Sequence, residues 1–214
     1  MIKYLGAPGD LDGKNTYDIN DYVEINGRRY STGFGIANKE EVYVCSSGCD
    51  YTTIQEAVNE TPFFMYATRV IYVKDGTYNE DVYVKPSICG RSTLTEGSIA
   101  CVRIVGNSSN INGVKVNSFQ TSGIIGADGL QLEYMQITGQ EPLSDENVSI
   151  SVYGSNNVEL KYLNFTGNVD YGFMAYGANV YGNHLYYNGQ THGAQAKNMG
   201  TIIFGDIPIV TGKP

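Results

Sequence analysis

Residues 158–165 read Val-Glu-Leu-Lys-Tyr-Leu-Asn-Phe, and residues 180–187 read Val-Tyr-Gly-Asn-His-Leu-Tyr-Tyr. Both segments have aliphatic or aromatic residues at their first, sixth and eighth positions, and segments 130–137 and 202–209 fit the same pattern. Steps of two residues are typical of β-strands, and the step of three between the third and sixth positions indicates a bend. We align the four segments on their first residues, which stand 28, 22 and 22 residues apart: Leu130, Val158, Val180 and Ile202.

A repeat of this length predicts a parallel β-solenoid. One coil cannot bury its own apolar side chains, but in a stack each inward residue lies over its equivalent in the next coil. Three of the units end in glycine, where a corner favours unusual backbone angles: Gly139, Gly167 and Gly189. The alternative all-β fold, an antiparallel sandwich, predicts hairpin turns every ~8–12 residues and no fixed repeat. We therefore predict a right-handed parallel β-helix over residues 41–214.

The first 40 residues follow a different pattern. Asn26-Gly27 joins two alternating segments, 21–25 and 28–31, and this dipeptide is a strong signal for a type I′ hairpin. The sequence predicts an N-terminal extension over residues 1–40 that contains this β-hairpin.

Composition supports one all-β domain and excludes several functions. The chain has 214 residues with 26 Gly and 18 Tyr, which favours strands and tight turns over helices. A net charge of −8 with 14 Lys and Arg argues against nucleic acid as a partner. No segment has the length and hydropathy of a membrane span, and the N-terminal stretch does not have the apolar run of a signal peptide.

The four cysteines allow two local disulfides, Cys45–Cys49 and Cys89–Cys101. A zinc site and reduced, buried thiols are the alternatives. Only Cys45 and Cys49 are closely spaced, and neither histidine is near them in sequence, so we expect no metal. Disulfides would indicate a virion surface, an extracellular location or a hyperthermophilic source, because ordinary cytosol keeps thiols reduced.

A short helix is predicted over residues 53–58, with Thr52 or Thr53 as its N-cap and Gln55 or Glu56 completing a capping box. Strands at 69–73 and 80–84 follow, with a turn between them. Two stretches here resemble the N-terminal coil of pectinesterases and related pectin-lyase-like proteins, namely Gly48-Cys49-Asp50-Tyr51-Thr52-Thr53-Ile54-Gln55-Glu56-Ala57-Val58 and Arg69-Val70-Ile71-Tyr72-Val73-Lys74-Asp75-Gly76-Thr77-Tyr78-Asn79-Glu80. The resemblance implies a helix that caps the open end of a β-helix, followed by a Gly-x-Tyr-x-Glu element.

Pectinesterase chemistry, as the resemblance implies, uses one aspartate as nucleophile, a second as acid and base, glutamines that hold the oxyanion, and an arginine. A Gln-Asp-Thr element would be expected near Gln190-Thr191-His192, and an Asp-Phe-Ile-Phe-Gly element near residues 200–205, but both stretches are without the aspartate. Loss of both carboxylates removes the nucleophile and the proton carrier together. A carbohydrate-active enzyme of pectinesterase-like or lyase type with an altered active site is therefore the alternative function, with a groove lined by Asp170, Gln190, His192 and Asp206.

Four tyrosines are the candidate ligand-binding residues, because aromatic rings along a groove can stack on sugars: Tyr153, Tyr171, Tyr176 and Tyr186. Tyrosine is also an ordinary strand residue, so a purely structural role is the competing interpretation. The first hypothesis is a non-catalytic surface or virion protein, spike-like or fibre-like, that binds a polysaccharide or a glycosylated receptor. We expect no cofactor, and three solenoids side by side would form a homotrimer.

Overall fold

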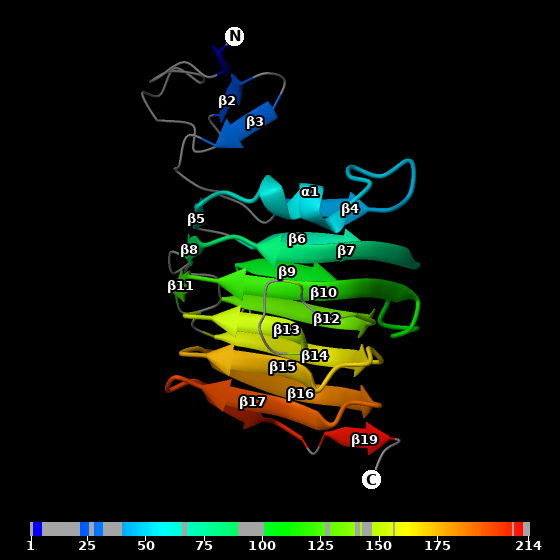
Figure 1. Cartoon of the computed structure of the whole chain (residues 1–214). Helices are drawn as coiled ribbons and strands as arrows, with labels where there is room; N and C mark the ends of the chain where they lie inside the picture. Colours follow the sequence, from blue (N-terminus) through cyan, green and yellow to red (C-terminus); the bar gives the residue numbers. More distant parts are fainter. Residues whose placement is uncertain are drawn as a thin grey trace.

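The chain forms a parallel β-helix, in which successive strands wind into stacked coils (Figure 1). The computed structural model describes residues 2–5, 22–25, 28–31, 40–65, 68–89, 101–126, 129–139, 142, 147–155, 157–206 and 208–211. Every strand pair described in the β-helix is parallel. This confirms the predicted fold class and excludes the antiparallel sandwich.

Face 1 of the β-helix contains the first part of each repeat. Val158 pairs with Val180 and Val180 pairs with Ile202, so equivalent positions of the 22-residue repeat are neighbours in space. Its strands are β4 (Glu40–Val44), β6 (Arg69–Val73), β9 (Val102–Val105), the first halves of β12 (Leu130–Ile137), β14 (Val158–Phe165) and β16 (Asn179–Asn188), and β18 (Thr201–Phe204).

Two further faces complete each coil. Face 2 contains the second halves of β12, β14 and β16, the first halves of β7 (Gly76–Val84) and β10 (Val114–Ser122), and β19 (Ile209–Thr211). Face 3 contains the second halves of β7 and β10 with β13 (Val148–Tyr153), β15 (Tyr171–Tyr176) and β17 (His192–Lys197). A small separate sheet contains β5 (Phe64–Met65), β8 (Ser87–Cys89) and β11 (Ile124–Gly126).

The chain turns from face 1 to face 2 at one residue in each of three successive coils. Tyr134, Tyr162 and His184 have φ angles of 56°, 51° and 51°, in the left-handed region. The three residues occupy the gap between the third and sixth positions of the repeat, where the step of three predicts a bend. Their rings stack on one another, with centroids 4.7 Å apart for Tyr134–Tyr162 and 4.5 Å apart for Tyr162–His184.

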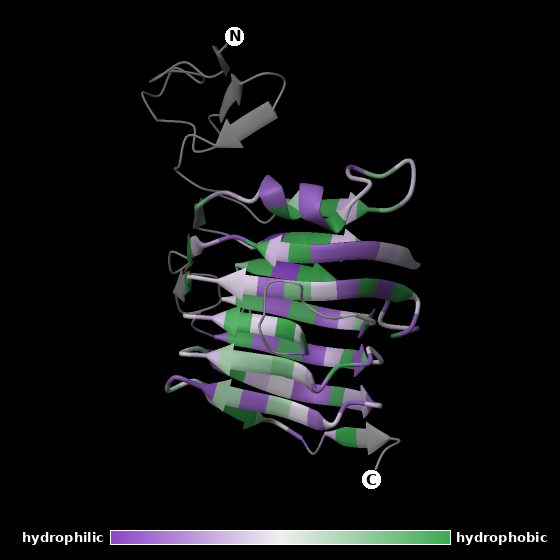
Figure 2. Cartoon of the chain, in the orientation of Figure 1, coloured by the Kyte–Doolittle hydropathy of each residue, from purple (hydrophilic) through white to green (hydrophobic). Residues whose placement is uncertain are grey.

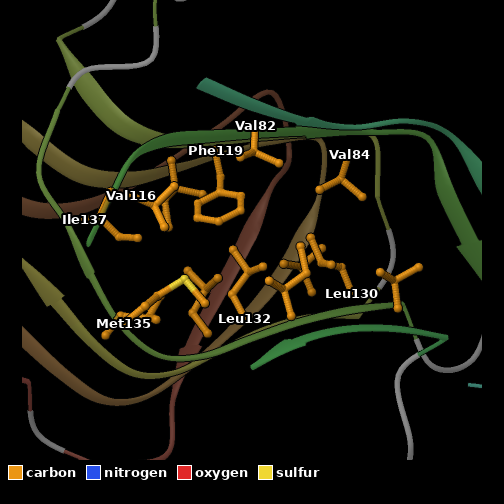
Figure 3. Close-up of a cluster of buried hydrophobic side chains, with 14 of the residues drawn as sticks. Val82, Val84, Val116, Phe119, Leu130, Leu132, Met135 and Ile137 are labelled. Carbon is orange, nitrogen blue, oxygen red and sulfur yellow. The ribbon is translucent and has the colours of Figure 1, made fainter. Parts of the chain in front are cut away.

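The core lies inside the coils, between the three faces. Hydrophobic and hydrophilic residues alternate along the strands (Figure 2), so one side of each strand can face inward. Val82, Phe119, Leu132 and Met135, from β7, β10 and β12, point toward one another in this interior (Figure 3), and each is at most 1% exposed.

Helix α1 (Ile54–Asn59) covers the N-terminal end of the stack and buries Ile54, Ala57 and Val58. The Thr53 side chain accepts a hydrogen bond from the Glu56 backbone N–H at 3.2 Å, as the capping box predicts. Glu80, on β7, accepts from the backbone N–H groups of Ile54 and Gln55 at 3.0 and 2.9 Å. The last residue of the Gly-x-Tyr-x-Glu element therefore attaches the cap to the second coil.

A second set of hydrogen bonds joins the helix to β6. The Arg69 guanidinium donates to the Tyr51 hydroxyl at 3.1 Å and to the Ala57 carbonyl at 3.3 Å. Tyr51 donates in turn to the Glu60 carboxylate at 2.6 Å. Burial, followed by the hydrogen bond to Glu60, raises the pKa of Tyr51 to about 12, so the phenol remains a neutral donor at ordinary pH.

Cys45 and Cys49 form a disulfide across the loop between β4 and α1, which rules out zinc and free thiols at this pair. Cys101 is also disulfide-bonded, while the side chain of its predicted partner Cys89 lies outside the described residues. Within the described ranges the helix has only 6 residues, and no helix there is long and apolar enough to cross a membrane.

The predicted N-terminal hairpin is confirmed. Strands β2 (Tyr22–Ile25) and β3 (Arg28–Ser31) pair antiparallel, with Ile25 opposite Arg28. Strand β1 (Ile2–Leu5) pairs antiparallel with the other side of β2. The turn dipeptide Asn26-Gly27 lies outside the described residues.

We predict that Glu80→Ala lowers the free energy of unfolding by about 1.5–3 kcal/mol, because two helix N–H groups lose a charged acceptor. Asn79→Ala is the matched control, since Asn79 is an exposed neighbour on the same strand. Urea unfolding followed by circular dichroism measures both. Equal losses for the two variants would contradict this role of Glu80.

Candidate functional site

Three of the four predicted ligand-binding tyrosines lie on face 3. Tyr153 and Tyr176 stack at the C-terminal ends of β13 and β15, with centroids 4.5 Å apart, and Tyr171 stacks on His192 at 4.9 Å. Tyr186 belongs to face 2, where it pairs with Asn164 and Ile209. We call Tyr153, Tyr171, Tyr176 and His192 the aromatic strip.

The Tyr153–Tyr176 pair lies over a buried layer of the same face. The Tyr176 hydroxyl donates to the Met174 sulfur at 3.3 Å, and Met174 is completely buried. The neighbours of the pair in the pairing register are Ser122, next to Tyr153, and Lys197, next to Tyr176.

Asp170 lies directly beside the aromatic strip, at the corner that leads from face 2 into face 3. Its backbone carbonyl accepts from the His192 N–H at 2.7 Å, and its backbone N–H donates to the Asn147 carbonyl at 2.8 Å. The Thr191 hydroxyl donates to the Asp170 carboxylate at 3.4 Å. These residues belong to three successive coils, and the corner brings together an exposed carboxylate and a hydroxyl, while the neighbouring His192 ring stacks on Tyr171.

Gln190 belongs to the same corner but is only 5% exposed. Its side-chain nitrogen donates to the Gly167 carbonyl at 2.9 Å, one coil away, while its side-chain oxygen is buried without a hydrogen-bond partner. The Gln190 amide nitrogen thus links two coils, while the amide oxygen accepts no hydrogen bond.

Asp206 does not join this corner, contrary to the predicted four-residue groove. Its carboxylate accepts from the His184 backbone N–H at 2.8 and 2.9 Å, and His184 Nδ1 lies 3.5 Å from Asp206 Oδ2. His184 is at the bend from face 1 to face 2, and the face 2 strand lies between that bend and Gln190. Parallel stacking places Asp206 over His184, its equivalent one coil earlier, and away from Asp170.

A buried tyrosine sets the shape of the Asp170 corner. Tyr187 is 1% exposed and stacks on Phe165 inside the helix, with centroids 5.1 Å apart. A Cβ atom on Gly172 would lie 2.5 Å from Tyr187 Cε1, and one on Gly193 would lie 3.3 Å from Tyr187 Cζ. Glycine directly after Tyr171 and after His192 therefore lets the chain pass close to this ring while the two aromatic side chains stack.

The glycines at this corner are a signal in the sequence. Gly167 and Gly189 each stand two residues after the equivalent strand residues Phe165 and Tyr187. The corner is one residue shorter in the later coil, because Tyr171 pairs with His192. Within the described residues, no three His, Cys, Asp or Glu side chains gather closely enough to hold a metal ion.

A family model described as Pectinesterase matches residues 41–171, which is more than half of the chain. The chain belongs to the pectinesterase family. No curated protein matches it. Membership in this family supports a carbohydrate-related function.

The matched region of this pectinesterase-family chain runs from the first coil to the start of β15. It includes Asp170 and ends before Gln190, His192 and Asp206. Of the four candidate catalytic residues, only Asp170 lies in the part of the chain that the family model covers. Its contacts in the neighbouring coils, with Asn147, Thr191 and His192, are to neutral or basic residues.

Gly172→Ala is expected to lower the free energy of unfolding by about 1–3 kcal/mol, because the added methyl overlaps the rigid Tyr187 ring. Gly205→Ala is the control, since a Cβ there would have no neighbour closer than 3.6 Å. Urea denaturation gives both values. If the two variants are equally stable, Tyr187 does not constrain the corner as described.

Proposed function

We propose that this protein is a non-catalytic, polysaccharide-binding β-helix whose binding surface is the aromatic strip on face 3. The observation that carries the proposal is the arrangement of Tyr153, Tyr171, Tyr176 and His192 as two stacked pairs on one rigid face. Tyrosine presents an apolar ring together with a hydroxyl, which suits the apolar faces and hydroxyl groups of sugars. A polysaccharide or the glycan of a receptor is the proposed ligand.

The position of the carboxylates favours binding over catalysis. The chemistry implied by the resemblance to pectinesterases requires two aspartates that act together. Asp206 is held by the His184 backbone at another corner, where it cannot supply the second carboxylate to Asp170. The Asp170 carboxylate accepts a hydrogen bond from Thr191, so its partner in this bond is a hydroxyl group and not a second carboxyl group.

We further propose that the protein acts on a cell or virion surface, in a spike or fibre, or in the extracellular medium. The Cys45–Cys49 disulfide supports this, because such bonds persist in oxidising surroundings. A homotrimer of parallel solenoids remains part of the proposal, and sedimentation at two protein concentrations would distinguish it from a monomer.

Tyr153→Ala is expected to weaken polysaccharide binding about tenfold, since a stacked aromatic ring contributes on the order of 1 kcal/mol beyond its buried area. Tyr181→Ala is the control, because Tyr181 is an exposed tyrosine, 39% accessible, on face 1. Isothermal titration against a panel of soluble polysaccharides measures both. Equal losses in the two variants would contradict the assignment to face 3, and no binding across the panel would contradict the function.

A second candidate function is an esterase of altered mechanism, which the Asp170 corner favours, because the exposed Asp170 carboxylate accepts a hydrogen bond from the Thr191 hydroxyl and the Asp170 backbone pairs with that of His192. In this alternative Asp170 is the nucleophile or base, and His192 transfers the proton. It predicts methanol or acetate release from esterified polysaccharide, lost in Asp170→Ala and kept in the face 1 control Glu159→Gln. Release that is undetectable in the wild type would exclude this candidate and leave the binding proposal standing.

A further inference from the structure

We infer that one sugar ring of the polysaccharide binds beside Ser122, where it continues the Tyr153–Tyr176 stack and hydrogen-bonds the hydroxyl groups of Tyr83 and Ser122. The inference rests on the proposed polysaccharide-binding function and places one ring of the ligand within it. Tyr83 and Ser122 are additions to the site, because neither belongs to the aromatic strip.

The position belongs to a row of side chains on the outer surface of face 3. In the pairing register Ser122 is next to Tyr153, and Tyr176 is next to both Tyr153 and Lys197. These residues come from β10, β13, β15 and β17, which follow one another along the helix axis (Figure 1). The residues that precede the first three members of the row are at most 1% exposed, namely Thr121, Val152 and Ala175. Because side chains alternate along a strand, the row itself points outward.

Ser122 leaves room in this row for a ring. The Tyr153 and Tyr176 rings stack with centroids 4.5 Å apart and planes inclined by 9°. Neighbouring strands are about 4.8 Å apart, so the position one coil before Tyr153 is at stacking distance from its ring. The Ser122 side chain ends at Oγ and is too short to extend over that ring. Among the rings that the structure describes, Tyr153 contacts Tyr176 alone, so a ligand ring can continue the stack.

Two hydroxyl groups adjoin the same position. Tyr83 Oη and Ser122 Oγ lie 2.9 Å apart, so one hydroxyl donates to the other. The accepting hydroxyl keeps its own proton, and both oxygens keep lone pairs that can accept from a ligand. Tyr83 is 40% exposed, which makes this side chain accessible from solvent. An aromatic ring face beside hydroxyl groups suits a sugar, which combines an apolar ring face with hydroxyls that both donate and accept.

The main chain holds these groups in place before any ligand binds. On one side Tyr83 pairs with Gln120 of β10. On the other side the Gln55 amide of helix α1 accepts from the Tyr83 backbone N–H at 2.7 Å and donates to the Tyr83 carbonyl at 3.1 Å. Directly after Ser122, the Gly123 N–H donates to the Tyr153 carbonyl at 3.1 Å. A preorganised site of this kind loses less conformational entropy on binding.

Ser122→Tyr tests the position, because a third tyrosine ring on Tyr153 would occupy the place of the sugar. Isothermal titration with soluble glucan, galactan, mannan and polygalacturonate first identifies a polysaccharide that binds the wild-type chain. Ser122→Tyr should weaken binding of that polysaccharide at least tenfold. Lys197→Tyr is the matched control, since it adds the same ring at the other end of the row, next to Tyr176, and should leave the affinity unchanged.

Tyr83→Phe tests the hydrogen bonds. It keeps the ring and removes the hydroxyl, so it should weaken binding about fivefold. Tyr43→Phe is the control, because Tyr43 is an exposed tyrosine, 41% accessible, on face 1. Urea unfolding of every variant separates a loss of binding from a loss of fold, and Tyr83→Phe decides the question if Ser122→Tyr does not fold.

Three results would overturn the inference. If folded Ser122→Tyr or Tyr83→Phe binds as tightly as the wild type, the position is wrong while the polysaccharide-binding function stands. If Lys197→Tyr loses as much affinity as Ser122→Tyr, the loss does not come from the place beside Ser122. If no polysaccharide binds the wild-type chain, the proposed function fails and the inference fails with it.

Discussion

Stacking of each inward side chain on its equivalent in the next coil is the interaction on which the β-helix depends. Leu163 illustrates it, because its neighbours in the pairing register are Met135 on one side and Leu185 on the other. No coil buries these residues alone, so the strands of successive coils must pair in parallel and in register. The same constraint explains why the N-terminal end of the stack has a cap: helix α1 covers apolar side chains that have no earlier coil above them.

The Gly-x-Tyr-x-Glu element, which resembles the corresponding element of pectinesterases, stabilises this helix cap. In the Gly-x-Tyr-x-Glu element, Tyr78 donates to the Lys74 carbonyl at 2.8 Å, and Glu80 accepts from two N–H groups of the helix. Both residues hold the first coils together. Their presence establishes the architecture that the chain shares with pectinesterases, and it carries no information about chemistry in the later coils.

The pairing register of the strands also sets the positions of side chains on the outer surface. Rings on adjacent coils are placed above one another, which produces the Tyr153–Tyr176 and Tyr171–His192 pairs on face 3 and the Tyr134–Tyr162–His184 column at the bend. Each pair is aligned along the helix axis, and the two pairs stand at opposite ends of β15. The Tyr134–Tyr162–His184 column stabilises the backbone at the bend. All three residues have positive φ angles, and the stacking of their rings helps to hold them in that conformation.

The sequence by itself determined the coils, the bend, the helix cap and the hairpin, because each depends on local periodicity or on residues close together in the chain. The 22-residue spacing of Val158, Val180 and Ile202 is enough to define neighbours in a parallel stack. Only the tertiary structure decided which functional candidates meet. The sequence predicts that Asp170 and Asp206 line one groove, yet the Asp170 backbone pairs with that of His192 while the Asp206 carboxylate is held by the His184 backbone. The reason is that a side chain's face depends on where each coil turns, and those corners are set by contacts between coils, such as Tyr187 against Gly172, which no single segment contains.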